Sequence, residues 1–404
     1  MTRRTASTTT ARVRRAHPAA WPWWVQALVV YGLARAVSAV VLVVVARSQE
    51  ENLWTDAAPS YVAYTARMWD ASWYEQIFAS GYPGALPVGP DGAVAQNAWA
   101  FYPLFPGLVR GLDAVTGLGW DVLAPLASLA CGAAAALVIH RLVATAGAAA
   151  VERRPGLPLA TVLLVAVFPS SPVLQVAYTE SLALLLVAAS LLLVARRRYG
   201  GAAVVIVLLG FARAVALPMA VVVLAHALVR WRRGDLRGPD AARLGGLLAV
   251  ALVSGFAWQW TCSVVTGVDQ AYFRTQEAWR GGSEVVPFVP WLDASRWLLG
   301  GAGPWALGLV LLATAALVLN PVSLRLGPEM LAWSGAYLAH LVAAVPPGTS
   351  LVRFLLLAFP LAAVTVGWTR SRAWLAAVTL AAVAGQVWWV WSLWRLVPPS
   401  GWPP

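Results

Sequence analysis

Apolar residues fill most of the chain in long runs that short polar stretches separate. The first run covers residues 21–46, and only Gln26 and Arg35 interrupt it. About 20 apolar residues suffice for a helix to cross the hydrocarbon core of a bilayer, so this run predicts a membrane-spanning helix. Similar runs follow at 122–144, 158–173, 179–195, 200–212, 214–229, 243–265, 302–319, 329–345, 351–368 and 373–394. The sequence therefore predicts an all-α, polytopic integral membrane protein with about eleven transmembrane helices.

The charged residues between these runs predict how the chain is oriented. Residues 1–20 are rich in arginine, threonine and alanine, and we interpret them as a disordered basic tail in the cytoplasm. With that end inside, the connections expected in the cytoplasm carry arginines, as at 196–198 and 230–237, and those expected outside carry most of the acids. This distribution follows the positive-inside rule. We therefore expect a multi-pass protein of the cell membrane, in contact with membrane lipids, whose residues 21–404 form a single transmembrane domain.

Composition excludes two classes of function. The 404 residues are 60% hydrophobic and 11% charged, which is too apolar for a soluble enzyme. The net charge is +12 and all 29 basic residues are arginine, but they are scattered between apolar runs and form no patch for a nucleic acid. Two cysteines and four histidines lie far apart and match no metal-site spacing. Among the histidines, His340 lies inside an apolar run, where a hydrogen-bonded structural role and a contact with substrate are both open.

Two longer segments between the runs are expected outside the membrane. Residues 47–120 form the first, with predicted interfacial helices at 60–80 and 99–115 that carry many aromatic residues. Residues 266–300 form the second, which mixes charged and aromatic side chains. This composition predicts either a polar site at the membrane surface or a solvated loop with an interface anchor, because loops carry function but also tolerate change.

The first of these segments places an acid among aromatic rings. Four of its residues share one stripe of a helix, because they are spaced by three, four and seven positions: Asp70, Trp73, Tyr74 and Ile77. Glu75 points to the opposite side of that helix and is expected to stay in water. The pattern therefore predicts that the carboxylate of Asp70, but not that of Glu75, faces an apolar surface rich in rings.

Further charged residues lie at the edges of apolar runs, where a charge needs a reason because it costs about 2.5–3.5 kcal/mol at the bilayer centre. Glu180 follows Tyr178 and opens an apolar run, where it either caps the helix or orients a sugar hydroxyl or a cationic partner. Arg213 and Arg353 are expected near the external face, against the positive-inside trend. They either bind an anionic partner there or pair with Glu180 or Asp70.

An acid, two arginines and many rings at the external face indicate glycosyl transfer from a lipid-linked phosphosugar. Aromatic faces suit sugar rings and lipid chains, and arginine matches phosphate bidentately. Asp70 is the predicted catalytic residue, a general base worth about 10²–10⁴-fold, and arginine neutralises the departing phosphate. No carboxylate pair or DxD sequence suggests a metal, so we expect no metal and no cofactor besides the lipid-linked donor. The predicted substrate-binding residues are Trp69, Trp73, Tyr74, Tyr178, Glu180, Arg213 and Arg353.

Short motifs, met in order along most of the chain, resemble the PIG-V family, the GPI mannosyltransferase II group with its bacterial homologues. They are Trp69-Asp70-x-x-Trp73-Tyr74-x-x-Ile77 with Gly81-Tyr82, Phe101 to Pro106, Phe168-Pro169 with Tyr178 to Ser181, Phe211-Ala212-Arg213, and Arg353-Phe354 before Phe359-Pro360. The chain departs from the family after Arg213, where Ala214-Val215 stand in place of the usual Ser or Thr and Asn or Gly.

The resemblance implies a GT-C fold whose long first external loop holds the catalytic acid, here Asp70. It also implies a polyprenyl-phosphate-mannose donor and an inverting reaction outside the cytoplasm. The family's acceptor does not carry over to this chain, for which we expect a glycan or glycolipid as acceptor. Two alternatives remain: a transporter or flippase of lipid-linked sugars, and an inactive scaffold of the same fold. A transporter should carry charges at midplane depth and two related halves, which this sequence does not show.

Overall fold

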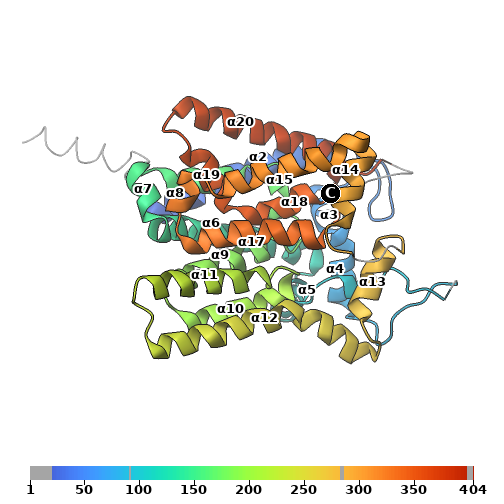
Figure 1. Cartoon of the computed structure of the whole chain (residues 1–404). Coiled ribbons are helices and arrows are strands. Elements are labelled where there is room, and N and C mark those ends of the chain that lie inside the picture. The colour runs from blue at the N-terminus through green and yellow to red at the C-terminus, as the bar shows by residue number, and fades with distance from the viewer. Residues whose placement is uncertain (1–20, 91, 283–285, 398–403) are drawn as a thin grey trace, which may run out of the picture.

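A computed structural model describes residues 21–90, 92–282, 286–397 and 404. The basic tail expected at 1–20 lies outside the described residues. Within them the protein is all-helical, with 75% of residues in helices and no strand. Long helices run side by side through the molecule, and several short helices gather at one end of them (Figure 1). The all-α prediction is therefore confirmed.

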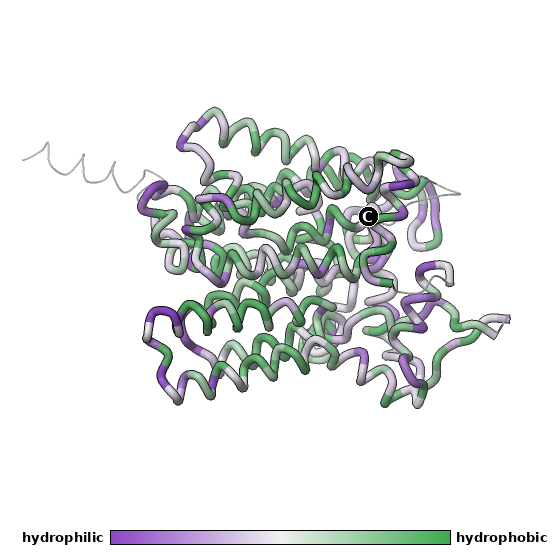
Figure 2. Tube along the Cα trace, viewed as in Figure 1, coloured by the Kyte–Doolittle hydropathy of each residue, from purple (hydrophilic) through white to green (hydrophobic). Residues whose placement is uncertain are grey.

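Five segments of the described chain are long and apolar enough to cross a bilayer. They are α2 (Trp23–Ala46), α6 (Trp120–Ala146), α12 (Gly238–Thr266), the stretch Val289–Arg325, and Arg372–Trp394. Hydrophobic residues follow the middle of the long helices, and hydrophilic residues concentrate towards the ends (Figure 2). These helices indicate a membrane protein, as the hydropathy predicts. The number eleven and the orientation stay predictions.

Two of these segments are not single helices. The first comprises α14 (Val289–Leu299), η4 (Gly300–Ala302), α15 (Gly303–Val318) and α16 (Pro321–Arg325). The second comprises α20 (Arg372–Trp389) and the π-helical turn η6 (Val390–Trp394). Such breaks still allow a segment to cross a bilayer where neighbouring protein satisfies the backbone.

Shorter helices fill the space between the long ones. In chain order they are α7 (Ala148–Arg153), α8 (Leu157–Ala166), η3 (Ser171–Gln175), α9 (Glu180–Ala195), α10 (Tyr199–Ala212), α11 (Pro218–Arg232), α17 (Pro328–Ala344), α18 (Leu351–Phe354), η5 (Leu355–Ala358) and α19 (Pro360–Gly367). The run at 158–173 is therefore broken after Ala166 and ends in η3, and the run at 351–368 is three short helices. Prolines at 169, 172 and 360 explain the breaks, because proline lacks the N–H of a helical hydrogen bond.

A buried arginine holds the break after α8. Arg35 of α2 is 5% exposed, and its guanidinium donates to the carbonyl oxygens of Ala166 and Ser171 and to Ser171 Oγ at 3.1 Å. The last carbonyls of a helix have no partner within it, and the negative end of the helix dipole attracts a cation. The one arginine of the first apolar run therefore terminates a neighbouring helix.

Replacing Arg35 by methionine is expected to destabilise the protein by roughly 1–3 kcal/mol, because two buried carbonyl oxygens lose a charged hydrogen-bond donor, although that of Ala166 keeps Ser171 Oγ at 2.8 Å. Thermal unfolding of the purified protein in one detergent measures the change. Arg47→Met is the matched control, because Arg47 follows the same helix but is exposed. Equal melting temperatures for the two variants would contradict the capping role.

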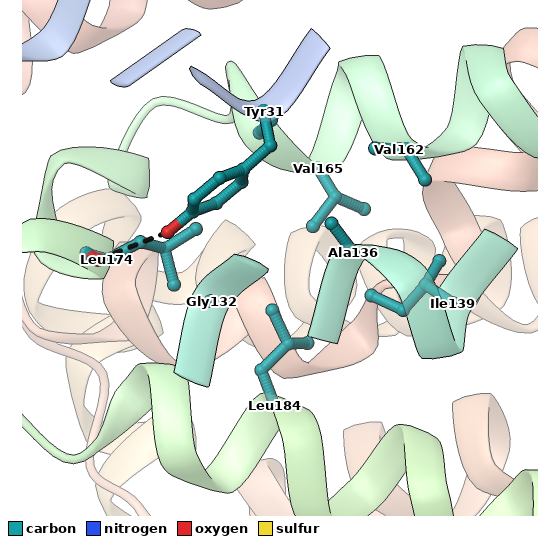
Figure 3. Close-up of a pocket in the computed structure, with 9 residues that line it drawn as sticks. Tyr31, Gly132, Ala136, Ile139, Val162, Val165, Leu174 and Leu184 are labelled. Carbon is teal, nitrogen blue, oxygen red and sulfur yellow. Dashed lines mark hydrogen bonds between the residues drawn. The ribbon is translucent and has the colours of Figure 1, made fainter. Parts of the chain in front are cut away.

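A close approach between α2 and α6 requires a glycine. Tyr31 Oη donates to the carbonyl oxygen of Leu174 at 3.4 Å, and both residues help to line a cavity of about 10 Å³ (Figure 3). A Cβ atom at Gly132 would lie 2.1 Å from that hydroxyl oxygen. Since no carbon sits that close to an unbonded oxygen, any larger residue at 132 would displace Tyr31.

The first long loop forms the short helices at one end of the molecule. They are α3 (Tyr61–Ala66), α4 (Asp70–Ser80), η2 (Ala98–Ala100) and α5 (Leu104–Thr116), and α13 (Ala271–Trp279) of the second loop joins them (Figure 1). The helix expected over 60–80 is therefore two helices, with a break at 67–69. That break makes Asp70 the first residue of α4.

Candidate active site

The backbone turns sharply just before Asp70. Trp69 adopts φ 59° and ψ −127°, a conformation that costs a residue with a side chain about 1–3 kcal/mol. Its indole N–H donates to the carbonyl oxygen of Trp394 at 2.6 Å, and its ring lies 5.3 Å from that of Trp54. The backbone N–H of Asp70 then donates to Tyr178 Oη at 3.0 Å. These contacts hold the strained turn and aim Asp70 at the segment before α9.

Four charged side chains alternate in sign from Asp70 inwards. Arg353 Nη1 lies 2.6 Å from Asp70 Oδ2, and Arg353 Nε lies 3.2 Å from Glu180 Oε1. The same Glu180 oxygen accepts a hydrogen bond from Arg213 Nη1 at 2.9 Å. The Glu180 side chain is 1% exposed, whereas that of Asp70 is 24% exposed. The cluster is therefore buried at Glu180 and open to ligands at Asp70.

Aromatic rings surround the two guanidinium groups. The Arg353 guanidinium lies 4.8 Å from the ring centre of Tyr178 and 5.2 Å from that of Phe354. Phe354 also lies 4.7 Å from the guanidinium of Arg213. Such faces attract a cation and limit the positions it can take. The rings therefore help to fix the positions of both guanidinium groups, so that carboxylates are not their only partners.

Tyr74 and Trp73 continue the site along α4. Tyr74 is buried, and its hydroxyl lies 3.3 Å from Thr179 Oγ1, which also accepts from Arg213 at 3.0 Å. Burial raises the pKa of the Tyr74 phenol, so the group is neutral and can donate a hydrogen bond. Trp73 is partly exposed and stacks on Phe101, with ring centres 5.7 Å apart.

The predicted site residues divide into those that meet and those that do not. Asp70, Tyr178, Glu180, Arg213 and Arg353 form one connected cluster, which Tyr74 joins through Thr179. The pairing of both arginines with Glu180 and Asp70, one of the two alternatives for them, is present. Binding of an anion by them stays a prediction. Trp69 contacts Trp54 and Trp394 instead of the charged side chains of the cluster, and its predicted contact with substrate stays a prediction.

Glu75 differs from expectation. It is half-buried rather than solvated, and this burial raises the pKa of its carboxyl. His340 takes the structural alternative, because its Nε2 donates to the carbonyl oxygen of Ala214 at 2.8 Å. Both acids of α4, Asp70 and Glu75, thus have reduced access to water. Of the two, Asp70 is the one that pairs with the arginine cluster.

The second loop contributes contacts that the sequence did not specify. Trp279 of α13 lies edge-on to Trp73, with ring centres 5.2 Å apart, and 5.4 Å from Phe101. Asn97 Nδ2 donates to Thr275 Oγ1 at 3.3 Å. Helix α13 therefore packs on the first loop rather than standing free in solvent. Its aromatic content was the only signal for this in the sequence.

The arrangement offers a carboxylate with partial access to ligands, backed by cations in a ring-lined wall. A carboxylate accepts protons, and planar guanidinium groups match phosphate oxygens. Within the described residues, no group of three His, Cys, Asp or Glu side chains could hold a metal ion. In comparisons with protein-family models and with curated proteins, this chain matched none, so the family resemblance rests on its sequence motifs.

Proposed function

We propose that this protein is an inverting glycosyltransferase that moves a sugar, with mannose as the expected donor sugar, from a polyprenyl phosphate to an extracytoplasmic glycan or lipid. The observation that carries the proposal is the chain of charges Asp70–Arg353–Glu180–Arg213, open at the acid and buried behind it. The apolar helices around it suit a lipid-linked donor, and the sequence motifs resemble those of a mannosyltransferase family.

The charge balance of the cluster favours an incoming phosphate. Asp70 and Glu180 together offset Arg213 and Arg353, so the four groups sum to zero. When Asp70 turns from Arg353 to an acceptor hydroxyl, the remaining three groups carry one net positive charge. A buried positive charge without a counter-ion is costly, so a phosphate that takes the place of Asp70 is stabilised there.

The reaction then uses the two partners of the Asp70–Arg353 ion pair, one for the acceptor and one for the phosphate. The acceptor hydroxyl oxygen attacks the anomeric carbon of the donor, and Asp70 takes the hydroxyl proton. The bond between the anomeric carbon and the phosphate oxygen breaks, and its electron pair stays on that oxygen. Arg353 donates hydrogen bonds to the phosphate as this charge develops. The products are a glycoside with the opposite anomeric configuration and the free polyprenyl phosphate.

Glu180 acts in this scheme as a positioning residue. It contacts both arginines with one oxygen and stands at the first position of α9, where the helix dipole stabilises a carboxylate. Both alternatives for this residue, a helix-terminal role and the orientation of a cationic partner, are thereby compatible. Arg353 stays anchored through Glu180 when it leaves Asp70, so it remains in place for the phosphate.

Transfer by the purified protein tests the proposal directly. Liposomes that contain the protein are supplied with labelled polyprenyl-phosphate mannose, glucose or arabinose and with extracts of cell-envelope glycans and glycolipids. We expect one donor to be consumed, with release of polyprenyl phosphate and inversion at the anomeric carbon. Movement of intact donor across the bilayer without its consumption would identify a flippase instead. If the donor is neither consumed nor moved across the bilayer, the result would indicate an inactive scaffold.

A further inference from the structure

A polar groove in the first loop lies next to the candidate active site. It has a volume of about 430 Å³ and is lined by side chains of the segment 52–67. Its lining residues include the aromatic Trp54, the polar Asn52, Asp56 and Ser60, and the basic Arg67. Sites for small ligands typically have volumes of about 300–1,000 Å³ and a few polar groups that fix orientation.

We propose that this groove binds the acceptor saccharide of the reaction inferred above, so this inference rests on the proposed function. The combination of one partly exposed indole with hydroxyl, amide and carboxylate groups suits a sugar. The C–H face of a sugar packs on an aromatic ring, and its hydroxyls bond to carboxylate and hydroxyl oxygens.

The charges of the groove favour a neutral ligand over an anionic one. Arg67 is already paired with Asp121, through Nε to Oδ1 at 2.9 Å and through Nη2 to Oδ2 at 2.5 Å. Asp56 is an exposed acid in the same lining. With its cation satisfied and an acid beside it, the groove offers no excess positive charge to a phosphate. This sets it apart from the arginine cluster, to which the donor phosphate is assigned.

The groove is joined to Asp70 by direct contacts. The Trp54 ring lies 5.3 Å from the ring of Trp69, the residue before Asp70. Thr55 Oγ1 contacts Met68 Sδ at 3.8 Å in the same turn. Arg67 lines the groove and is three positions before Asp70. Because neighbouring Cα atoms are about 3.8 Å apart, the Cα atoms of these two residues lie at most about 11 Å apart. An oligosaccharide of several residues is long enough to extend from the groove over that distance.

Binding without turnover tests the groove apart from the reaction. Asp70→Asn protein in nanodiscs, free of glycoside detergents, is examined by saturation-transfer NMR with methyl α-mannoside and with α-linked manno- and gluco-oligosaccharides. We expect a signal from at least one saccharide. It should be lost in Trp54→Ala and in Ala63→Trp, which fills the groove from α3. Controls are Trp297→Ala, an exposed indole elsewhere, and Ala57→Trp, the same bulk in the same loop outside the lining.

Kinetics on the active protein complete the test. We expect Trp54→Ala to raise the acceptor KM about tenfold, with the donor KM unchanged, as the loss of one ring contact predicts. No saccharide signal, or a signal that neither groove variant reduces, would overturn the groove. An unchanged acceptor KM in an active enzyme would also overturn it while the transferase stands. If the wild-type protein binds a saccharide but transfers no sugar, the groove stands as a binding site and the proposed function is wrong.

Discussion

Asparagine in place of Asp70 is expected to lower sugar transfer by about 10²–10⁴-fold, the contribution of a general base. The amide is the same size as the carboxylate and still accepts a hydrogen bond from Arg353, but it takes up no proton at neutral pH. Turnover of labelled polyprenyl-phosphate sugar by equal amounts of purified protein measures the effect. The amount of folded protein should fall little, because Asp70 is partly exposed and Glu180 remains next to Arg353 as a counter-charge.

Glu75→Gln is the matched control for this experiment. It makes the same chemical change on the same helix, but Glu75 makes no ion pair with the arginine cluster in the described structure. We expect it to retain nearly full turnover. Wild-type rates in Asp70→Asn would remove this acid from the mechanism, and an equal loss in both variants would indicate damage to α4 rather than loss of a base.

Alanine in place of Arg353 is expected to have the second largest effect. Loss of one group that stabilises charge in a transition state costs about 10²–10³-fold in rate. The change also leaves Glu180 buried with only Arg213 as a charged partner, so stability should fall as well. The measurement is therefore kcat/KM for the donor, with protein concentration corrected for the folded fraction.

Arg353→Lys separates the two effects. Lysine keeps the charge next to Asp70 and Glu180 but lacks the planar fork that binds two phosphate oxygens. We expect near-normal folding and a higher donor KM, while the acceptor KM stays unchanged. Arg280→Lys serves as control, because Arg280 follows α13 and donates to the carbonyl oxygen of Ala344 instead of joining the cluster. Unchanged donor dependence in Arg353→Lys and Arg353→Ala would assign Arg353 to structure.

The hydropathy pattern was sufficient to predict the helical, membrane-type architecture and the approximate positions of most helices. The run at 122–144 is α6, and the run at 179–195 is α9, each within a few residues. Helices of this kind are readable because apolar length alone decides them. The breaks within 158–173 and 351–368 were harder to predict, because the cost of a proline depends on which groups satisfy the freed backbone. At the first break that group is Arg35, which is distant in the sequence.

The site residues could be named from local patterns, but their partnership could not. Asp70 was a candidate because this acid shares one stripe of a helix with aromatic residues. Arg353 was a candidate because it lies at the predicted external end of its apolar run, where the positive-inside rule does not place a cation. The two are 283 positions apart, and only the packed structure brings them to 2.6 Å. The packing likewise pairs His226, in the middle of α11, with Glu329 in the first turn of α17 at 2.5 Å, a contact without any signal in the sequence. Polarity and period are local properties of a chain, whereas the pairing of charges is set by which helices pack together.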